Sequence, residues 1–325
     1  MKILIFTLLL SIASSPTLSM QFELPDPNNN VVGEPSETTI DEPQTLEQVG
    51  REHELGPREM QAANPGLSKT AKLPAGTTVV LPTQFILPKE REGIVINVAE
   101  FRLYFFPEGT NSVETFPVAI AMVGRHVPLG KTKVVQKLID PVWYPTPSER
   151  AVMPYLPRAV GPGPNNPLGP RALLLGIPDV LIHGTNKPQS VGTRASFGCF
   201  RMFKEHVGSF WDRVPVGMKV ALVNRPTSFG FDDDDIYIRM MPALEGEKPN
   251  EQFDQAISDL RASTDAPVQF DVDLKSLKSG KRDGSVVKVG RVDRMPQQEP
   301  EQEKEQASKS QTSLKSQASR EFLIE

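Results

Sequence analysis

The chain has 325 residues, of which 38% are hydrophobic and 23% charged, and its formal net charge at pH 7 is −4. This mildly negative balance gives no argument for binding to nucleic acid or to an anionic membrane surface. Because Cys199 is the single cysteine, an intramolecular disulfide is excluded and the fold must rest on an ordinary hydrophobic core. The length allows two domains, or one domain with appendages.

Residues 1–19 are predicted to be a secretory signal peptide. Lys2 precedes an apolar run, residues 3–12, and small and polar residues follow it. The run is too short to span a bilayer, which requires roughly 20 apolar residues. No cysteine follows it, which excludes a lipoprotein anchor. Residues 20–40 are rich in Pro, Asn, Ser and Glu, and we expect them to form an extended leader.

Residues 41–85 are predicted to form a small module with two helices. A capping-box pattern at Thr45 begins the first helix, and Pro57 is placed near the start of a second helix, 58–63. A β-prone segment, 77–82, follows. This order resembles a LysM module, a small βααβ fold that binds the N-acetylglucosamine-containing glycan of cell walls. The usual Gly-Asp before the first helix is absent, and a helical hairpin packed on the next domain is the alternative.

From Gly93 onward, short β-prone segments alternate with glycine and proline turns, which predicts a mainly β domain built as a sandwich or barrel. The proline-rich segment 142–170 is predicted to be a long surface loop of the kind that commonly carries function. One helix is expected after Cys199. Its apolar face, interpreted as core, comprises Phe203, Val207, Phe210 and Trp211.

The C-terminal part is predicted to be a hairpin followed by a polar tail. The hairpin covers 226–245, with the four aspartates of 232–235 at its turn. These aspartates lack the alternating spacing of a calcium loop, so we interpret them as solvated. Residues 246–325 are expected to be largely disordered, with some apolar patterning between Phe253 and Leu277.

Cys199 and His183 are the candidate nucleophile and base. Cys199 lies in a segment with turn chemistry, beside a glycine and near an arginine, whereas a buried structural cysteine is the alternative. An unperturbed thiol, with a pKa of ~8.5, is only a few per cent thiolate at neutral pH. Pairing with the His183 imidazolium, and the positive end of the helix that follows, would lower that pKa.

Neighbouring residues are candidates for supporting roles. The amides of Gly198 and Cys199 could face a developing oxyanion, and Ser196 is grouped with them. Arg201 could hold a substrate carboxylate by a bidentate contact, or form an ion pair that fixes the loop. The remaining candidates, for support of the His183 imidazole, are Thr185, Asn186 and the carbonyl of Gly184.

These residues resemble the L,D-transpeptidase catalytic family, also called the YkuD family. The matching pieces, within about residues 91–225, are Asn166-Pro167-Leu168-Gly169, Ile182-His183-Gly184-Thr185-Asn186, and Ser-x-Gly-Cys-x-Arg at 196–201. With the LysM-like module before it, the chain is most similar to the ErfK/YbiS-like subgroup, which attaches an outer-membrane lipoprotein to peptidoglycan. Many members carry His where this chain has Phe197, so we expect an altered pocket shape with catalysis retained. His126 and His206 are interpreted as surface or structural residues.

The resemblance implies that Cys199 is the acylated nucleophile and His183 its base, with no metal or cofactor. The thiolate attacks the amide between diaminopimelate and D-alanine in a tetrapeptide stem of peptidoglycan, and D-alanine leaves. An amine then resolves the thioester, either from an outer-membrane (lipo)protein or from a second diaminopimelate, which gives a 3–3 crosslink. Together with the signal peptide, this implies a periplasmic enzyme associated with the cell wall.

Two other readings stay open. If water resolves the thioester, the protein is an L,D-carboxypeptidase or an enzyme that detaches linked proteins. A non-catalytic wall-binding protein would use only the LysM-like module and the tail. The presence of Cys199, His183 and Gly198 argues against that last reading, because a pure binder has no need for them.

Overall fold

The computed structural model of the protein describes residues 19–264 and 266–293. The expected signal peptide lies outside the described residues except for Ser19, and so does the polar tail from residue 294 onward. Within the described ranges, no helix is long and apolar enough to cross a membrane.

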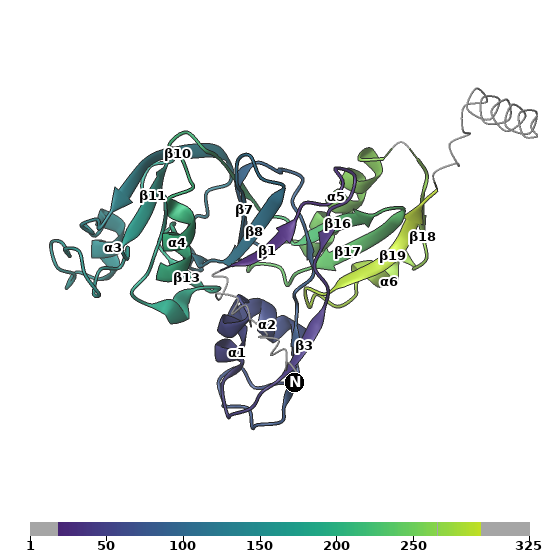
Figure 1. Ribbon diagram of the computed structural model, residues 1–325, viewed down its shortest axis with the longest axis horizontal. Coiled ribbons are helices and arrows are strands. Elements are labelled where there is room, and N and C mark those ends of the chain that lie inside the picture. Colours follow the sequence, from purple (N-terminus) through teal and green to yellow (C-terminus); the bar gives the residue numbers. More distant parts are fainter. Residues whose placement is uncertain (1–18, 265, 294–325) are drawn as a thin grey trace, which may run out of the picture.

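A nine-stranded main sheet confirms the expected mainly β architecture (Figure 1). Its order is β1-β8-β7-β6-β15-β10-β11-β12-β14, and two neighbouring pairs, β6 with β15 and β12 with β14, are parallel. The bounds are β1 Met20–Glu23, β6 Gly93–Asn97, β7 Arg102–Phe106, β8 Ser112–Pro117, β10 Gly130–Ile139, β11 Arg171–Leu175, β12 Leu181–His183, β14 Phe200–Arg201 and β15 Lys219–Val223. A small parallel pair, β9 (Ile120–Ala121) with β13 (Arg194–Ser196), is linked to β14 of the main sheet by the bridge between Ala119 and Arg201.

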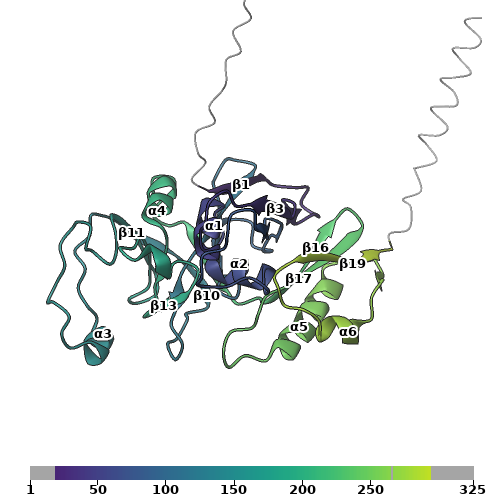
Figure 2. The same cartoon turned by 90° about the horizontal axis from the view of Figure 1, so that it is seen from below.

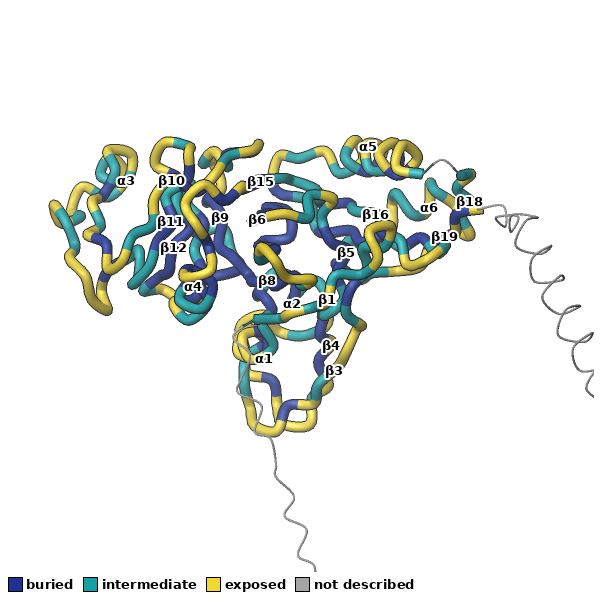
Figure 3. The backbone as a smooth tube through the Cα atoms, turned by 45° about the horizontal axis from the view of Figure 1, so that its top comes forward, coloured by how far each residue is buried: buried dark blue, intermediate teal, exposed yellow. Residues whose placement is uncertain are grey.

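The neighbouring strands β6, β7 and β8 of the main sheet are buried on both faces, whereas β10 is largely exposed (Figure 3). Alternate side chains of β6 enter different cores, because successive side chains point to opposite faces. Ile94 and Ile96 belong to the core beneath α4 (Lys204–Trp211), whose apolar face is buried there as expected. Val95 belongs to a second core, which the N-terminal helices share. The sheet therefore depends on what covers each side.

The N-terminal unit encloses two helices between two strands. Helices α1 (Leu46–Glu52) and α2 (Pro57–Ala63) lie between β3 (Ser36–Thr39) and β4 (Thr78–Leu81), which pair antiparallel. The expected capping box at Thr45 is present. The amide of Asn64 donates to the Val80 carbonyl at 2.8 Å and accepts from the Val80 N–H at 2.9 Å. These two hydrogen bonds join the end of α2 to β4.

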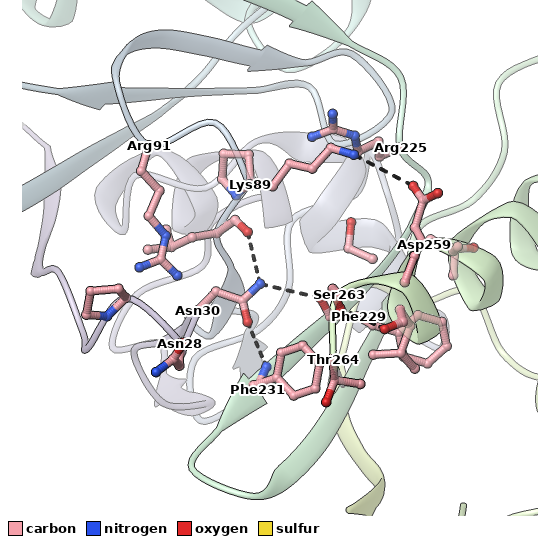
Figure 4. Close-up of a pocket in the computed structure, with 18 residues that line it drawn as sticks. Asn28, Asn30, Lys89, Arg91, Arg225, Phe229, Phe231, Asp259, Ser263 and Thr264 are labelled. Atoms are coloured by element: carbon pink, nitrogen blue, oxygen red, sulfur yellow. Dashed lines mark hydrogen bonds and ion pairs between the residues drawn. The ribbon is translucent and has the colours of Figure 1, made fainter. Parts of the chain in front are cut away.

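The expectation of an extended leader over residues 20–40 is wrong. β1 is the edge strand of the main sheet, and β2 (Val31–Val32) pairs with β5 (Phe85–Ile86). The Phe22 ring lies 5.8 Å from that of Phe85, so a few apolar residues anchor a polar segment. Asn30 donates to the carbonyls of Leu87 and Phe229 and accepts from the Phe231 N–H at 2.7 Å (Figure 4).

The expectation of disorder from residue 246 onward is also wrong for its described part, residues 246–264 and 266–293. The hairpin of β16 (Thr227–Asp232) and β17 (Asp235–Met240) is confirmed, but it continues into a four-stranded sheet in the order β16-β17-β19-β18. The added elements are α5 Pro249–Ala262, β18 Val268–Phe270, α6 Leu274–Lys278 and β19 Val286–Val292. Phe253, Ile257 and Leu260 form a buried stripe on α5 at helical spacing. A narrow stripe suffices to fold a segment whose average composition is polar.

A cluster of buried charges joins the three parts of the chain, and we call it the charge cluster: Glu59 on α2, Glu100 and Arg102 of the main sheet region, and Arg239 on β17. Arg102 donates both Nη2 and Nε to the Glu59 carboxylate. Arg239 lies 3.8 Å from carboxylate oxygens of both Glu59 and Glu100. Two positive and two negative charges thus neutralise one another away from water.

Glu59→Gln should lower the free energy of unfolding by roughly 3–5 kcal/mol, because Arg102 then stays buried without its carboxylate. As a matched control, Glu92→Gln removes one partner of the exposed Lys219–Glu92 pair and should cost less than about 1 kcal/mol. Chemical denaturation of the two variants measures the difference. Equal stability of Glu59→Gln and the parent protein would show that the charge cluster does not hold the parts together.

Candidate active site

Two short parallel strands bring Cys199, His183 and Arg201 to one place. In the pairing of β12 with β14, Ile182 lies opposite Phe200 and His183 lies opposite Arg201. Ile182 and Phe200 are fully buried in the core beneath α4. Because side chains alternate along a strand, His183 and Arg201 share the other face. Cys199 directly precedes β14, and its Sγ lies 3.3 Å from the carbonyl oxygen of Asp179, two residues before β12. The candidate nucleophile and base thus lie on neighbouring segments beside Arg201.

The backbone beside His183 fixes its tautomer. Nδ1 lies 2.5 Å from the Gly184 carbonyl oxygen, and since a carbonyl can only accept, Nδ1 carries the proton of the neutral imidazole. The Leu168 backbone is a second partner of the ring. Burial, followed by the positive charge of Arg201, lowers the pKa of His183 to about 4. The imidazole is therefore neutral at neutral pH.

The two other candidates for supporting the imidazole have different partners. Thr185 Oγ1 accepts from the Lys187 N–H at 3.0 Å, and Asn186 Nδ2 donates to the Asn165 carbonyl at 2.8 Å. Of the three possibilities taken from the sequence, the Gly184 carbonyl is the one that contacts the ring. Thr185 and Asn186 instead fix the loop that follows β12.

The Asn166-Pro167-Leu168-Gly169 motif supports the backbone next to His183. Gly169 has φ of +65°, and a Cβ there would lie 3.0 Å from Gly184 backbone atoms, so no other residue fits without displacement. Asn166 is buried and donates to the Pro141 and Gly161 carbonyls. The motif thus packs the end of the 142–170 loop against Gly184, whose carbonyl contacts the His183 imidazole.

The Cys199 thiol is protonated at rest. Its Sγ donates to the Asp179 carbonyl at 3.3 Å. Burial raises the pKa of Cys199 to about 11, which the Leu181 backbone and Arg201 oppose and the charges of Glu149 and Asp179 reinforce. The lowered pKa expected from the sequence is therefore wrong for this state, because desolvation outweighs the neighbouring positive charge.

Ser196 and Gly198 shape the loop that carries the nucleophile. Ser196 Oγ donates to the Cys199 carbonyl at 2.5 Å and accepts from the Gly198 N–H at 3.2 Å. Gly198 has φ of +144°, and an added Cβ would meet no atom within 4 Å, so its requirement for glycine is conformational. The Gly198 amide, expected as an oxyanion donor, is bonded to Ser196 in this state.

Arg201 has the properties of an anion-binding residue. Its Nε is buried and has no hydrogen-bond partner within the described ranges, and burial lowers its pKa, which the charges of Cys199 and Glu149 oppose. No carboxylate of the described residues lies within ion-pair distance of it, so a loop-fixing ion pair is not observed. The unsatisfied N–H favours a ligand carboxylate as its partner.

Sequence reasoning missed Glu149, whose charge acts on both Cys199 and Arg201. It lies on α3 (Pro147–Val152), a short helix inside the 142–170 loop, and closes a capping box with Thr146. The Thr-x-x-Glu spacing before a helix was the signal that could have found it. In Figure 2, α3 lies at the end of the molecule opposite the C-terminal sheet.

The remaining residues singled out by sequence have structural positions. His206 is buried and lies 2.5 Å from Glu54, which joins α4 to the N-terminal unit, whereas His126 is exposed. The Arg125 guanidinium lies 4.6 Å from the centroid of the Phe197 ring. Phe197 thus brings a second cation close to the nucleophile loop.

Alkylation of Cys199 by iodoacetamide should be slow at pH 7 and accelerate about tenfold per pH unit up to about pH 10, because only the thiolate reacts and the thiol pKa is about 11. His183, with a pKa of about 4, supplies no imidazolium over this range. Mass spectrometry measures the rate without ambiguity, since the chain has one cysteine. A rate that levels off near pH 7 would establish a preformed thiolate–imidazolium pair and contradict this description.

Comparison with known proteins gives a consistent result. The family model of the L,D-transpeptidase catalytic domain, YkuD, matches residues 91–222. The probable L,D-transpeptidase ErfK/SrfK of Salmonella typhimurium is 37% identical over 238 residues, which cover 70% of this chain and 76% of the relative. The probable L,D-transpeptidase YbiS of Escherichia coli K12 is 38% identical over 229 residues, 68% of this chain and 74% of the relative.

Among solved structures, the catalytic domain of the E. faecium L,D-transpeptidase matches 41% of this chain and 97% of its own length, at 17% identity and a TM-score of 0.32. That likeness is too weak to add to the assignment. The identity and coverage of the curated relatives are sufficient by themselves. The chain belongs to the L,D-transpeptidase catalytic domain family, whose members act on peptidoglycan.

Proposed function

We propose that the protein is a periplasmic L,D-transpeptidase in which Cys199 cleaves the bond between diaminopimelate and D-alanine in a peptidoglycan tetrapeptide stem. The observation that supports this most strongly is the β12–β14 pairing, in which His183 lies opposite Arg201 and Cys199 directly precedes β14. The Nε of Arg201 has no hydrogen-bond partner among the described residues. Membership of the family supplies the substrate class.

The reaction proceeds by two acyl transfers. The Cys199 proton passes to Nε2 of His183, and sulfur attacks the amide carbonyl carbon. When the tetrahedral intermediate collapses, the C–N bond breaks and the imidazolium gives its proton to the departing amine of D-alanine. His183 then accepts a proton from the acceptor amine, which attacks the thioester, and the thiol is restored.

Substrate charge assists the first proton transfer. In the free enzyme the transfer is strongly uphill, because the thiol pKa is about 11 and the imidazole pKa about 4. Arg201 is one of the causes that hold the His183 pKa low. A substrate carboxylate bound to Arg201 offsets that positive charge and so makes His183 a stronger base at the moment the stem is in place.

Cys199→Ala should abolish D-alanine release from a soluble tetrapeptide muropeptide without changing the unfolding midpoint, because it removes the nucleophile and one small atom of packing. His183→Ala should reduce kcat by at least about 100-fold, as general-base losses do, whereas His126→Ala, at an exposed histidine, should retain the parent rate. Release of D-alanine is followed with a coupled assay. Turnover by purified Cys199→Ala at the parent rate would refute the assignment.

The N-terminal unit is proposed to bind wall glycan in the manner of a LysM module, supported by its βααβ order and the Asn64 bonds to β4. Deleting it would expose apolar residues of the core it shares with β6 and β7, so competition is the better test.

N-acetylglucosamine tetramer should displace the Cys199→Ala protein from isolated sacculi, because it offers the glycan without the peptide. Bound protein is measured by sedimentation, with a glucose tetramer as control. Identical retention in both sugars would exclude glycan recognition by this unit.

For the acceptor, we propose the amine of an outer-membrane protein rather than a second diaminopimelate. The support is the resemblance of the chain, from the N-terminal unit through the catalytic domain, to the subgroup that attaches an outer-membrane lipoprotein to peptidoglycan. The ErfK/SrfK and YbiS relatives also match more of the chain than the catalytic domain, and no residue of the site selects one amine over another. Water as acceptor, giving a carboxypeptidase or a protein-detaching hydrolase, remains the alternative.

Sacculi from a strain lacking the gene should lose protein-linked muropeptides relative to the parent strain. Digestion and mass spectrometry of the fragments measure this. A loss confined to 3–3 crosslinked dimers would instead identify a wall-crosslinking enzyme, and a loss of free tripeptides would identify a carboxypeptidase.

A further inference from the structure

A cavity lies outside the candidate active site, and we call it the junction pocket. It has a volume of about 350 Å³ and lies where α2, the residues leading into β13 and the chain after β17 meet. Its lining includes Arg58, Lys69, Phe101, Arg194 and Pro242. A cavity of this size falls within the range of small-molecule and peptide sites.

The junction pocket is positively charged. Three cationic side chains line it, and none of its lining residues is acidic. Arg58 donates to the Pro242 and Ala243 carbonyls, and Arg194 donates to the Ala121 and Met122 carbonyls. These neutral acceptors orient the two guanidinium groups without cancelling their charge.

The Arg58 guanidinium is held in place, and its positive charge is only partly compensated by nearby acidic groups. Its central carbon lies 5.0 Å from the centroid of the Phe101 ring. Burial, followed by the positive charge of Arg194, lowers the pKa of Arg58, and the charge of Glu247 only partly offsets this. Two like charges fixed near one another beside an open cavity favour an anion as the occupant.

Arg194, which lines the junction pocket, is close to Cys199 in the sequence. Arg194 begins β13, and Ser196 at its end holds the Cys199 loop by two hydrogen bonds. Cys199 is five positions after Arg194 in the chain, so their Cα atoms lie within about 18 Å of one another. A ligand that spans this distance can occupy both sites at once.

We propose that the junction pocket binds a carboxylate of an acidic peptide. Resting on the proposed function, this peptide is a second stem of the same glycan strand, held beside the stem that reacts at Cys199. The pocket then gives the enzyme a preference for wall fragments that carry two stems.

This proposal is tested by the kinetics of D-alanine release from two soluble fragments of the wall. The one-stem fragment carries a single tetrapeptide stem, and the two-stem fragment is a tetrasaccharide that carries two tetrapeptide stems. Lys69→Glu should raise KM for the two-stem fragment about fivefold and leave kcat, and KM for the one-stem fragment, unchanged. Lys69 is exposed and makes no hydrogen bond or ion pair with the described residues, so the variant should fold. Lys72→Glu, an exposed lysine of the same loop outside the pocket, carries the same charge change and should alter none of these constants.

The outcomes separate this inference from the proposed function. No D-alanine release by the parent enzyme would overturn the proposed function itself. Release by the parent, with Lys69→Glu and Lys72→Glu equal on both fragments, would overturn only the role of the pocket. A tetrasaccharide with one stem that matches the KM of the two-stem fragment would show that the pocket reads sugar, and would overturn recognition of a peptide carboxylate.

Discussion

The neutralisation of Glu59, Glu100, Arg102 and Arg239 away from water is the constraint on which the arrangement of the chain depends. Each of these groups is almost fully buried, and an unpaired charge at that depth would cost several kcal/mol. Their partners come from α2, the main sheet and β17. Displacing any one part therefore exposes or isolates charges in the others. Burial raises the pKa of Glu100, and its bond from Tyr104 at 2.6 Å keeps its carboxylate satisfied.

The charge cluster lies on the opposite side of the main sheet from the core that supports β12 and β14. The core beneath α4 fixes Ile182 and Phe200, and the parallel register then sets His183, Arg201 and Cys199 relative to one another. The N-terminal unit adds to this support through α4, since Arg51 pairs with Glu205 at 2.8 Å and Glu54 contacts His206. The N-terminal unit, which we propose to bind the wall, is thus connected to the candidate catalytic residues through packed elements.

The motifs of the candidate site can be recognised in the sequence, whereas its electrostatics cannot. Two of the motifs need particular residue types: the close approach to Gly184 needs a glycine at Gly169, and the Cys199 loop needs the hydroxyl of Ser196. The carbonyl that contacts His183 belongs to the backbone, so any residue would supply it. The pKa of Cys199 was not predictable, since it depends on burial by segments distant in sequence. Residues 20–40 and 249–292 were expected to lack structure because their composition is polar. They fold because strand pairing and short apolar stripes need tertiary partners that composition does not reveal.

The proposed reaction depends on acylation of Cys199 by a tetrapeptide stem. This step can be followed by intact-protein mass spectrometry after incubation with a tetrapeptide muropeptide and no acceptor amine. We expect a mass gain equal to the muropeptide less D-alanine, located on Cys199 and absent from Cys199→Ala. Release of D-alanine without any adduct on the protein at early times, or the same adduct on Cys199→Ala, would contradict it.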